Sequence, residues 1–133
     1  MINSGNFDFS FSGLKTAVLY QVKKHEEKLS DQYIKDMSAS FQQAAIDVLI
    51  SKTTKAAKEY DVKTVMLSGG VAANLELRKQ LKESIEKQAK FLMPEIGFCT
   101  DNGAMIAMAA FFRRSEKTNY SEIQADANLK LVA

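Results

Sequence analysis

The stretch KTVMLSGGVAANLELRKQL, residues 63–81, determines the fold class that the sequence predicts. It opens with the apolar and β-branched residues of a short buried strand, turns at Gly69 and Gly70, and continues with helical spacing. In α/β folds, a strand that leads through glycines into a helix brings backbone N–H groups close to a nucleotide. Two interpretations stay open. Gly69, Gly70 and Asn74 contact a nucleotide, or the glycines only turn the chain and Asn74 caps the helix.

The segment before this stretch predicts a strand and two helices. Phe7, Phe9 and Phe11 alternate along FDFSF, which is typical of a strand. An amphipathic helix is expected over residues 14–29. Ser30 can cap a second helix, whose apolar stripe continues to Tyr60. A helix of about 30 residues would span roughly 45 Å, so we expect a break or kink in it.

After the helix at residues 74–88, the run AKFLMP predicts another strand that ends at Pro94. The apolar run in FCTDNGAMIAMAAFF, residues 98–112, predicts a buried helix. Asp101 stands just before this helix and fits two roles. It can cap the helix and meet its positive end, or it can be a metal ligand held rigidly at the helix start.

FSFSGLKT, residues 9–16, resembles a phosphate-binding loop only superficially. That motif needs a lysine directly after its second glycine and another glycine five residues upstream, where this chain has Asp8. The simpler interpretation is a turn into a helix, with Ser12 as the cap and Lys15 in solvent. Cys99 is the only cysteine, which excludes a disulfide framework and gives no nucleophile with a neighbouring base.

Composition indicates an ordinary globular protein of 133 residues, with 46% apolar and 26% charged residues and a net charge of +2. Lysine supplies most of the basic residues, and arginine only three, which argues against a dedicated nucleic-acid surface. Neither a signal peptide nor a membrane-spanning segment is recognisable, so we expect a cytoplasmic protein. The alternation of strands and helices predicts an α/β fold. Three strands make a small sheet, so we expect residues 1–133 to be one partial domain, with a surface tail over residues 115–133.

Four stretches together resemble one family: FDFSFSGLKTAV, ASFQQAAIDVL, LSGGVAANLELRKQL and CTDNGAMIA. In this order and spacing, the chain resembles the C-terminal part of the tRNA N6-adenosine threonylcarbamoyltransferases, formerly described as O-sialoglycoprotein endopeptidases (glycoproteases). The resemblance implies the second lobe of an actin-like ATPase (ASKHA) fold, helix-rich and incomplete without the first lobe. It also implies transfer of threonylcarbamoyl from threonylcarbamoyl-AMP to N6 of adenosine 37 in tRNAs that read ANN codons. No peptidase motif supports the older description.

By the resemblance, Asp101 would be one ligand of an iron or zinc ion, and Asn74, beside Gly69 and Gly70, would contact the adenylate. ATP is a further possible nucleotide. Asp101 follows Asn74 by 27 positions, across one helix and one strand, so both can face one cleft. Ser12 and Lys15 lie in a family motif without an assigned role. The implied partners are tRNA, the missing N-terminal lobe and other subunits of the machinery that makes threonylcarbamoyladenosine.

The chain departs from the family pattern, because the His-x-x-x-His pair and the serine-glycine-glycine-histidine loop of the first lobe are missing. We therefore expect a fragment that neither holds the metal tightly nor transfers the group alone, and that self-associates through an exposed apolar face. Two alternatives remain. One is a non-catalytic actin-like interaction module that pairs with another subunit. The other is a different actin-like enzyme, such as a sugar kinase or a carbamoyltransferase.

Overall fold

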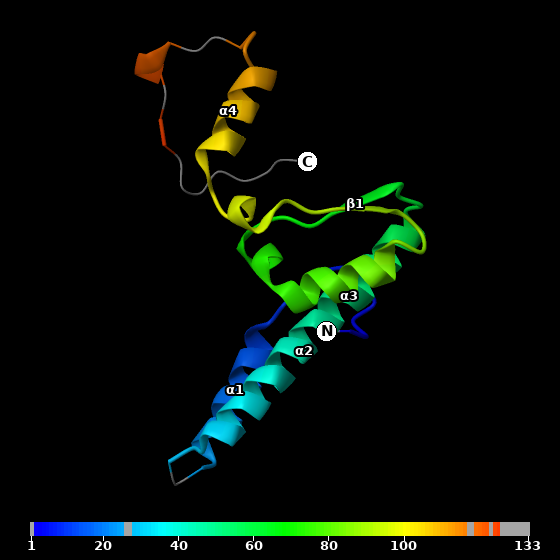
Figure 1. Ribbon diagram of the computed structural model, residues 1–133, viewed down its shortest axis with the longest axis vertical. Coiled ribbons are helices and arrows are strands. Elements are labelled where there is room, and N and C mark those ends of the chain that lie inside the picture. Colours follow the sequence, from blue (N-terminus) through cyan, green and yellow to red (C-terminus); the bar gives the residue numbers. More distant parts are fainter. Residues whose placement is uncertain (1, 26–27, 117–118, 123, 126–133) are drawn as a thin grey trace. The chain divides into compact units, whose positions relative to one another are not determined.

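The computed structural model describes residues 2–25, 28–116, 119–122, 124 and 125. These residues form a helix-rich α/β structure with a small parallel sheet (Figure 1). The chain divides into two compact units, Met1–Cys99 and Thr100–Ala133. None of the described helices combines the length and the apolar character that crossing a membrane requires.

The sheet of the first unit is built from one strand-helix-strand unit. β1 (Thr64–Met66) leads through a 3₁₀ turn (Gly70–Ala73) into α3 (Leu75–Ile85), and β2 (Lys90–Leu92) returns beside β1. The two strands are parallel, with Val65 opposite Phe91. The helix between them is the crossover that parallel strands require. Both strands and the helix agree with the sequence prediction.

α2 (Asp31–Glu59) is the longest element and runs without interruption (Figure 1). Ser30 caps it as predicted, because its hydroxyl oxygen accepts a hydrogen bond from the Tyr33 N–H at 3.2 Å. The predicted break or kink is wrong. The segment contains neither glycine nor proline, and side-chain pairs four residues apart, such as Gln43 with Asp47, support the helix along its surface.

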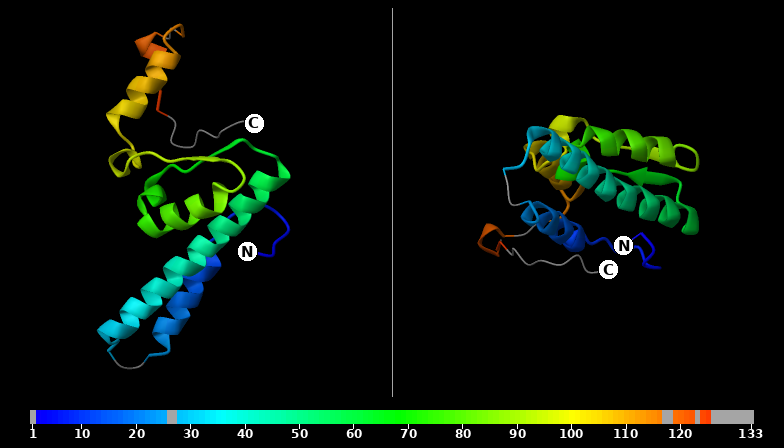
Figure 2. Two further views of the ribbon diagram at one scale, coloured as in Figure 1. Left: turned by 45° about the vertical axis from the view of Figure 1, so that its right-hand side comes forward. Right: turned by 90° about the horizontal axis from the view of Figure 1, so that it is seen from below.

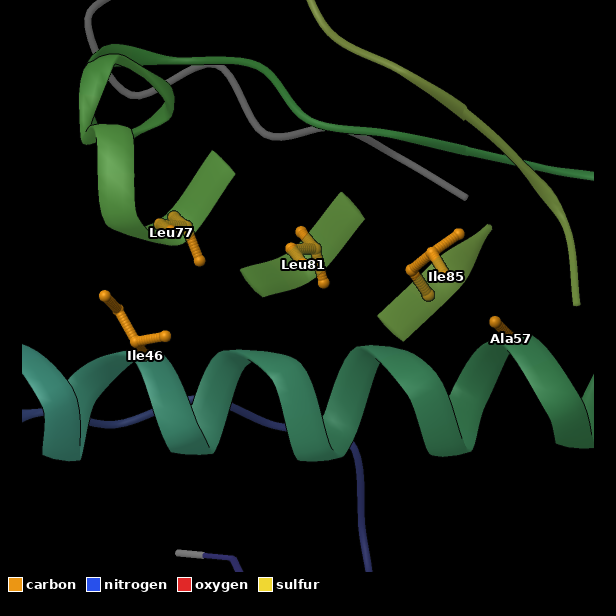
Figure 3. Packing of buried hydrophobic residues seen from close by; sticks show 5 residues of the cluster. All are labelled: Ile46, Ala57, Leu77, Leu81 and Ile85. Atoms are coloured by element: carbon orange, nitrogen blue, oxygen red, sulfur yellow. The ribbon is translucent and has the colours of Figure 1, made fainter. Parts of the chain in front are cut away.

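The core of the first unit lies between α2 and α3 (Figure 3). Leu77, Leu81 and Ile85 recur every fourth residue and form one face of α3, which packs against Ile46 and Ala57 of α2. Partly buried residues of α2, of both strands and of the segments next to them complete the cluster: Leu49, Ile50, Val62, Val65, Leu67, Ala89 and Phe91. The part of the α2 stripe before Ala44 stays outside this core, and Ile34 and Phe41 are exposed.

The predicted strand over residues 7–11 does not form. The backbone there has another hydrogen-bond partner, because the buried ammonium group of Lys52 donates to the carbonyl oxygens of Asn6 and Asp8, at 2.9 and 2.7 Å. The same ammonium binds the side-chain oxygens of Ser4 and Asn6. A lysine side chain from α2 therefore anchors the segment that a neighbouring strand would otherwise pair with.

α1 (Ser12–Lys23) begins two residues earlier than predicted and lies beside the first part of α2 (Figures 1 and 2). Phe11 occupies the cap position and forms no side-chain cap. The interpretation of Ser12 as the cap is therefore wrong, since Ser12 is already the first helical residue and its hydroxyl faces that of Ser10 at 3.1 Å. The end of the helix predicted over residues 14–29 includes positions outside the described residues.

In the second unit, α4 (Gly103–Phe112) forms where the sequence predicts a helix. Its cap is Asn102, whose side-chain oxygen accepts from the Met105 N–H at 3.0 Å, and not Asp101. The prediction that this helix is buried is wrong for this chain: Ile106 and Phe112 are among its exposed apolar residues. Of the predicted tail, a short 3₁₀ turn (Tyr120–Glu122) is described, and residues 126–133 lie outside the described part.

Candidate functional site

The candidate site lies where β1 ends, at the edge of the sheet where parallel α/β folds bind ligands. Leu67, the first residue after β1, still donates its N–H to the carbonyl of Leu92, the last residue of β2. Gly69 then takes φ 88° and ψ 172°, a backbone conformation that is essentially restricted to glycine. Gly70 begins the 3₁₀ turn that leads to α3. Gly69 is therefore required by the shape of this turn, whatever ligand the turn meets.

Asn74 ends the turn and caps α3. Its side-chain oxygen accepts from the Leu77 N–H at 2.9 Å, and its amide donates to the Gln42 side chain of α2, also at 2.9 Å. The capping interpretation of Asn74 is confirmed. It does not exclude ligand contact, because an amide oxygen accepts two hydrogen bonds and an amide nitrogen donates two, so one position on each atom remains.

Asn74 also lines a hollow of about 670 Å³ in the first unit. Lys15 of α1 lines the same hollow. Among the described residues that line it, no other is charged. The remaining lining is largely apolar: Phe11, Val18, Met37, Ser38, Phe41, Gln42, Ala45, Ile46, Leu49, Val71 and Leu77. A space of this size suits a small organic ligand. The structure thus brings together Lys15 and Asn74, which the sequence places 59 positions apart.

Ser12 borders a different hollow, together with Asp47 of α2. Although Ser12 and Lys15 belong to one sequence motif, they therefore face different surroundings. Among the predicted site residues of the first unit, Gly69, Gly70 and Asn74 follow one another in a single turn, and Lys15 joins Asn74.

Asp101 belongs to the second unit and has an exposed side chain. Because Asn102 caps α4, the Asp101 carboxylate is not needed to begin the helix. The described residues contain no group of three or more histidine, cysteine, aspartate or glutamate side chains that could hold a metal ion. One carboxylate alone does not make a zinc or iron site, so a metal here would need ligands from outside the described residues.

Two residues that the sequence pattern did not indicate contact the turn between β1 and α3. Gln42 holds the Asn74 amide, and Arg78, on the next turn of α3, donates to the carbonyl of Ala72 in the segment of residues 69–73, which we name the glycine turn. Arg78 could have attracted attention as one of only three arginines in a lysine-rich chain. Nothing in the sequence pattern identified Gln42, because its partner is 32 positions away.

Comparison with known proteins agrees with the resemblance. A family model described as tRNA N6-adenosine threonylcarbamoyltransferase matches residues 1–108, which include Gly69, Gly70, Asn74 and Asp101. A curated relative of that description from Thermosipho africanus is 47% identical over 133 residues, covering 98% of this chain and 40% of the relative.

Two further relatives carry the same description. The protein of Kosmotoga olearia is 48% identical over 124 residues, covering 92% of this chain and 36% of its own length. That of Bacillus subtilis strain 168 is 47% identical over 110 residues, covering 81% of this chain and 32% of its own length. The chain thus spans at most 40% of the length of these three relatives.

Proposed function

The chain belongs to the tRNA N6-adenosine threonylcarbamoyltransferase family, and we propose that it is part of an enzyme that modifies adenosine 37 of tRNAs reading ANN codons. The observation that carries this proposal is the family match over residues 1–108. The substrate is threonylcarbamoyl-AMP. The N6 amine attacks the carbonyl carbon of the threonylcarbamoyl group, the bond from that carbon to the phosphate oxygen breaks, AMP leaves and the amine loses a proton.

In this proposal, the glycine turn binds the adenylate. Gly69 and Gly70 let the backbone pass close to the nucleotide, and Asn74 uses the free hydrogen-bonding positions of its amide. The N-terminus of α3 adds the positive end of a helix dipole, which favours the phosphate of the adenylate. The hollow shared by Asn74 and Lys15 supports this placement, since it combines apolar surface with one ammonium group.

Asp101 would be one ligand of an iron or zinc ion, whose other ligands come from the part of the relatives that this chain does not span. When bound, such an ion would polarise the carbonyl or phosphate end of the adenylate. The finding that Asn102, and not Asp101, caps α4 supports this role, because the Asp101 carboxylate is not used as the helix cap.

We further propose that the chain is the second lobe of an actin-like ATPase fold: one partial domain with a surface tail over residues 115–133. A sheet of two short strands is too small to be stable alone, and exposed Met66 and Leu92 fit a surface that further chain covers. The proposed partners are tRNA, an N-terminal lobe and other subunits of the modification machinery. The proposed setting is the cytoplasm, and the isolated chain would self-associate.

The exposed apolar residues of α4 favour one alternative, a non-catalytic interaction module that pairs with another subunit. An actin-like sugar kinase or carbamoyltransferase would share the strand-glycine-helix corner but would not act on tRNA. The transfer assay below separates these possibilities, because only the first proposal requires threonylcarbamoyl to reach tRNA.

The test is threonylcarbamoyl transfer to tRNA, with threonylcarbamoyl-AMP and iron supplied. The chain is assayed alone and as a chimera, in which it replaces the matching part of the Thermosipho africanus relative. We expect activity from the chimera and none from the chain. Asp101→Ala should abolish activity of the chimera, whereas Glu122→Ala, a control in the same unit, should keep it. An inactive chimera that folds and binds metal like the relative would overturn the proposal.

A further inference from the structure

Arg78 joins three separate segments of the first unit. One guanidinium nitrogen, Nη1, donates to the carbonyl oxygen of Ala72 at 2.8 Å and lies 3.4 Å from the sulfur of Cys99. The other, Nη2, donates to the carbonyl oxygen of Pro94. Ala72 lies in the turn after β1, and Pro94 follows β2 by two residues. Arg78 therefore links the two loops at the carboxyl edge of the sheet.

Only arginine can make this set of contacts from one position. Its guanidinium group is a planar fork whose nitrogens donate in different directions, whereas lysine ends in a single ammonium. Both carbonyl oxygens belong to loop backbone that no strand pairs with, so each needs a donor. Hydrogen bonds from a charged donor are roughly twice as strong as neutral ones.

The position of Arg78 on α3 makes the link direct. Asn74 caps the helix, and the Arg78 N–H donates to the Asn74 carbonyl one turn later. The guanidinium group then reaches back to the turn that carries Asn74. Arg78 thus holds the end of the 3₁₀ turn at Ala72 and Asn74, and it also joins this end to the segment Pro94–Cys99.

We propose that Arg78 is a positioning residue, which fixes the glycine turn and Asn74 in the orientation that binds the adenylate by tying them to the loop after β2. The inference that the ligand is an adenylate rests on the proposed function. The linkage of the two loops does not, and it can be tested without any activity.

The first test uses Cys99, the only thiol of the chain, which is buried at 3% exposure. Its reaction rate with a thiol reagent such as dithionitrobenzoate under native conditions reports how often the Pro94–Cys99 segment opens. We expect Arg78→Gln to raise this rate about tenfold, since it removes charged hydrogen bonds that hold the segment. Arg78→Lys should give an intermediate rate.

The matched control is Lys79→Gln, which removes one positive charge from the exposed side of the same helix. It should leave the labelling rate unchanged. Urea unfolding of each variant shows whether labelling reports local opening or global unfolding. A labelling rate of Cys99 in Arg78→Gln that is within twofold of the rate in the parent chain would overturn the proposal. An equal acceleration of labelling in Lys79→Gln would overturn it as well.

The second test measures transfer kinetics in the chimera. A positioning role predicts that Arg78→Gln raises KM for threonylcarbamoyl-AMP about tenfold, with a smaller change in kcat, and that Arg78→Lys recovers part of the loss. An unchanged KM would overturn the link to the adenylate. Failure of the proposed function looks different: the unaltered chimera would not transfer the group, while the labelling of Cys99 would still respond to Arg78.

Discussion

The amide of Asn74 donates a hydrogen bond to the side-chain oxygen of Gln42 at 2.9 Å and so joins the start of α3 to α2. The oxygen of the same amide caps α3. A residue proposed to touch the substrate is thus held on two sides before any ligand arrives. Such prior fixation is what a binding site needs if the ligand is not to bear the cost of ordering it.

Two substitutions of Asn74 should distinguish its contribution to stability from its contribution to ligand binding. Asn74→Ala removes the cap and should lower the free energy of unfolding by about 1–2 kcal/mol. Asn74→Ser keeps a capping oxygen but removes the amide, so it should stay close to the parent chain in urea unfolding. In the chimera, however, Asn74→Ser should weaken binding of threonylcarbamoyl-AMP. Equal affinity in the serine variant would show that Asn74 is a cap only.

The free energy of unfolding that is lost when a leucine of α3 is replaced by alanine should depend on how deeply that leucine is buried. Leu81 is 3% exposed and Leu75, on the same helix, is 68% exposed. Leu81→Ala should therefore lower the free energy of unfolding by about 2–5 kcal/mol. Leu75→Ala should change it by less than about 0.5 kcal/mol. Urea denaturation followed by circular dichroism measures both, and similar losses in the two variants would contradict the observed packing.

Lys52 should control the order of the N-terminal segment. Lys52→Met preserves length but leaves the carbonyls of Asn6 and Asp8 without their donor, so hydrogen exchange of the amides at residues 7–10 should accelerate. Lys58→Met, at an exposed position of the same helix, is the control. Exchange rates that are equal in the two variants would mean that Lys52 does not anchor this segment.

Asp101 and Asn102 should differ in spite of being neighbours. Asn102→Ala removes the cap of α4 and should reduce the helicity of residues 103–112, as read from backbone chemical shifts. Asp101→Ala should leave that helicity unchanged and instead remove bound iron or zinc from the chimera, as measured by metal analysis. Loss of helicity in the Asp101 variant would mean that this carboxylate stabilises α4.

Acid should break one ion pair of the second unit. The hydrogen bond from Arg113 lowers the pKa of Glu116 below its ordinary range. The contribution of the pair is therefore present above the pKa of unfolded glutamate and is lost as the pH falls through the lower, folded value. Carboxyl titration by NMR should show the midpoint of Glu116 rising in Arg113→Gln. Because both side chains are solvent-exposed, the effect on unfolding should be small.

Two helix caps whose partners lie near in the chain were predictable from sequence, whereas Asn102 was not identified as the cap of α4, because its neighbour Asp101 fits the same role. Ser30 caps α2 through a residue three positions away, and Asn74 caps α3 in the same manner. The four-residue spacing of Leu77, Leu81 and Ile85 is likewise visible in the sequence and corresponds to the buried face of α3. The glycine turn was recognisable because only glycine adopts the conformation at Gly69.

The sequence by itself thus determined the strand-turn-helix unit, the caps at Ser30 and Asn74 and, through the resemblance, the family. Only the tertiary structure decided which distant groups meet. Lys52 donates to backbone carbonyls more than 40 positions away, in and next to the segment 7–11 that was predicted to be a strand. Arg78 likewise joins loops that are separate in sequence. Periodicity describes which face of an element is apolar, but it contains no information on where the end of a long, charged side chain lies.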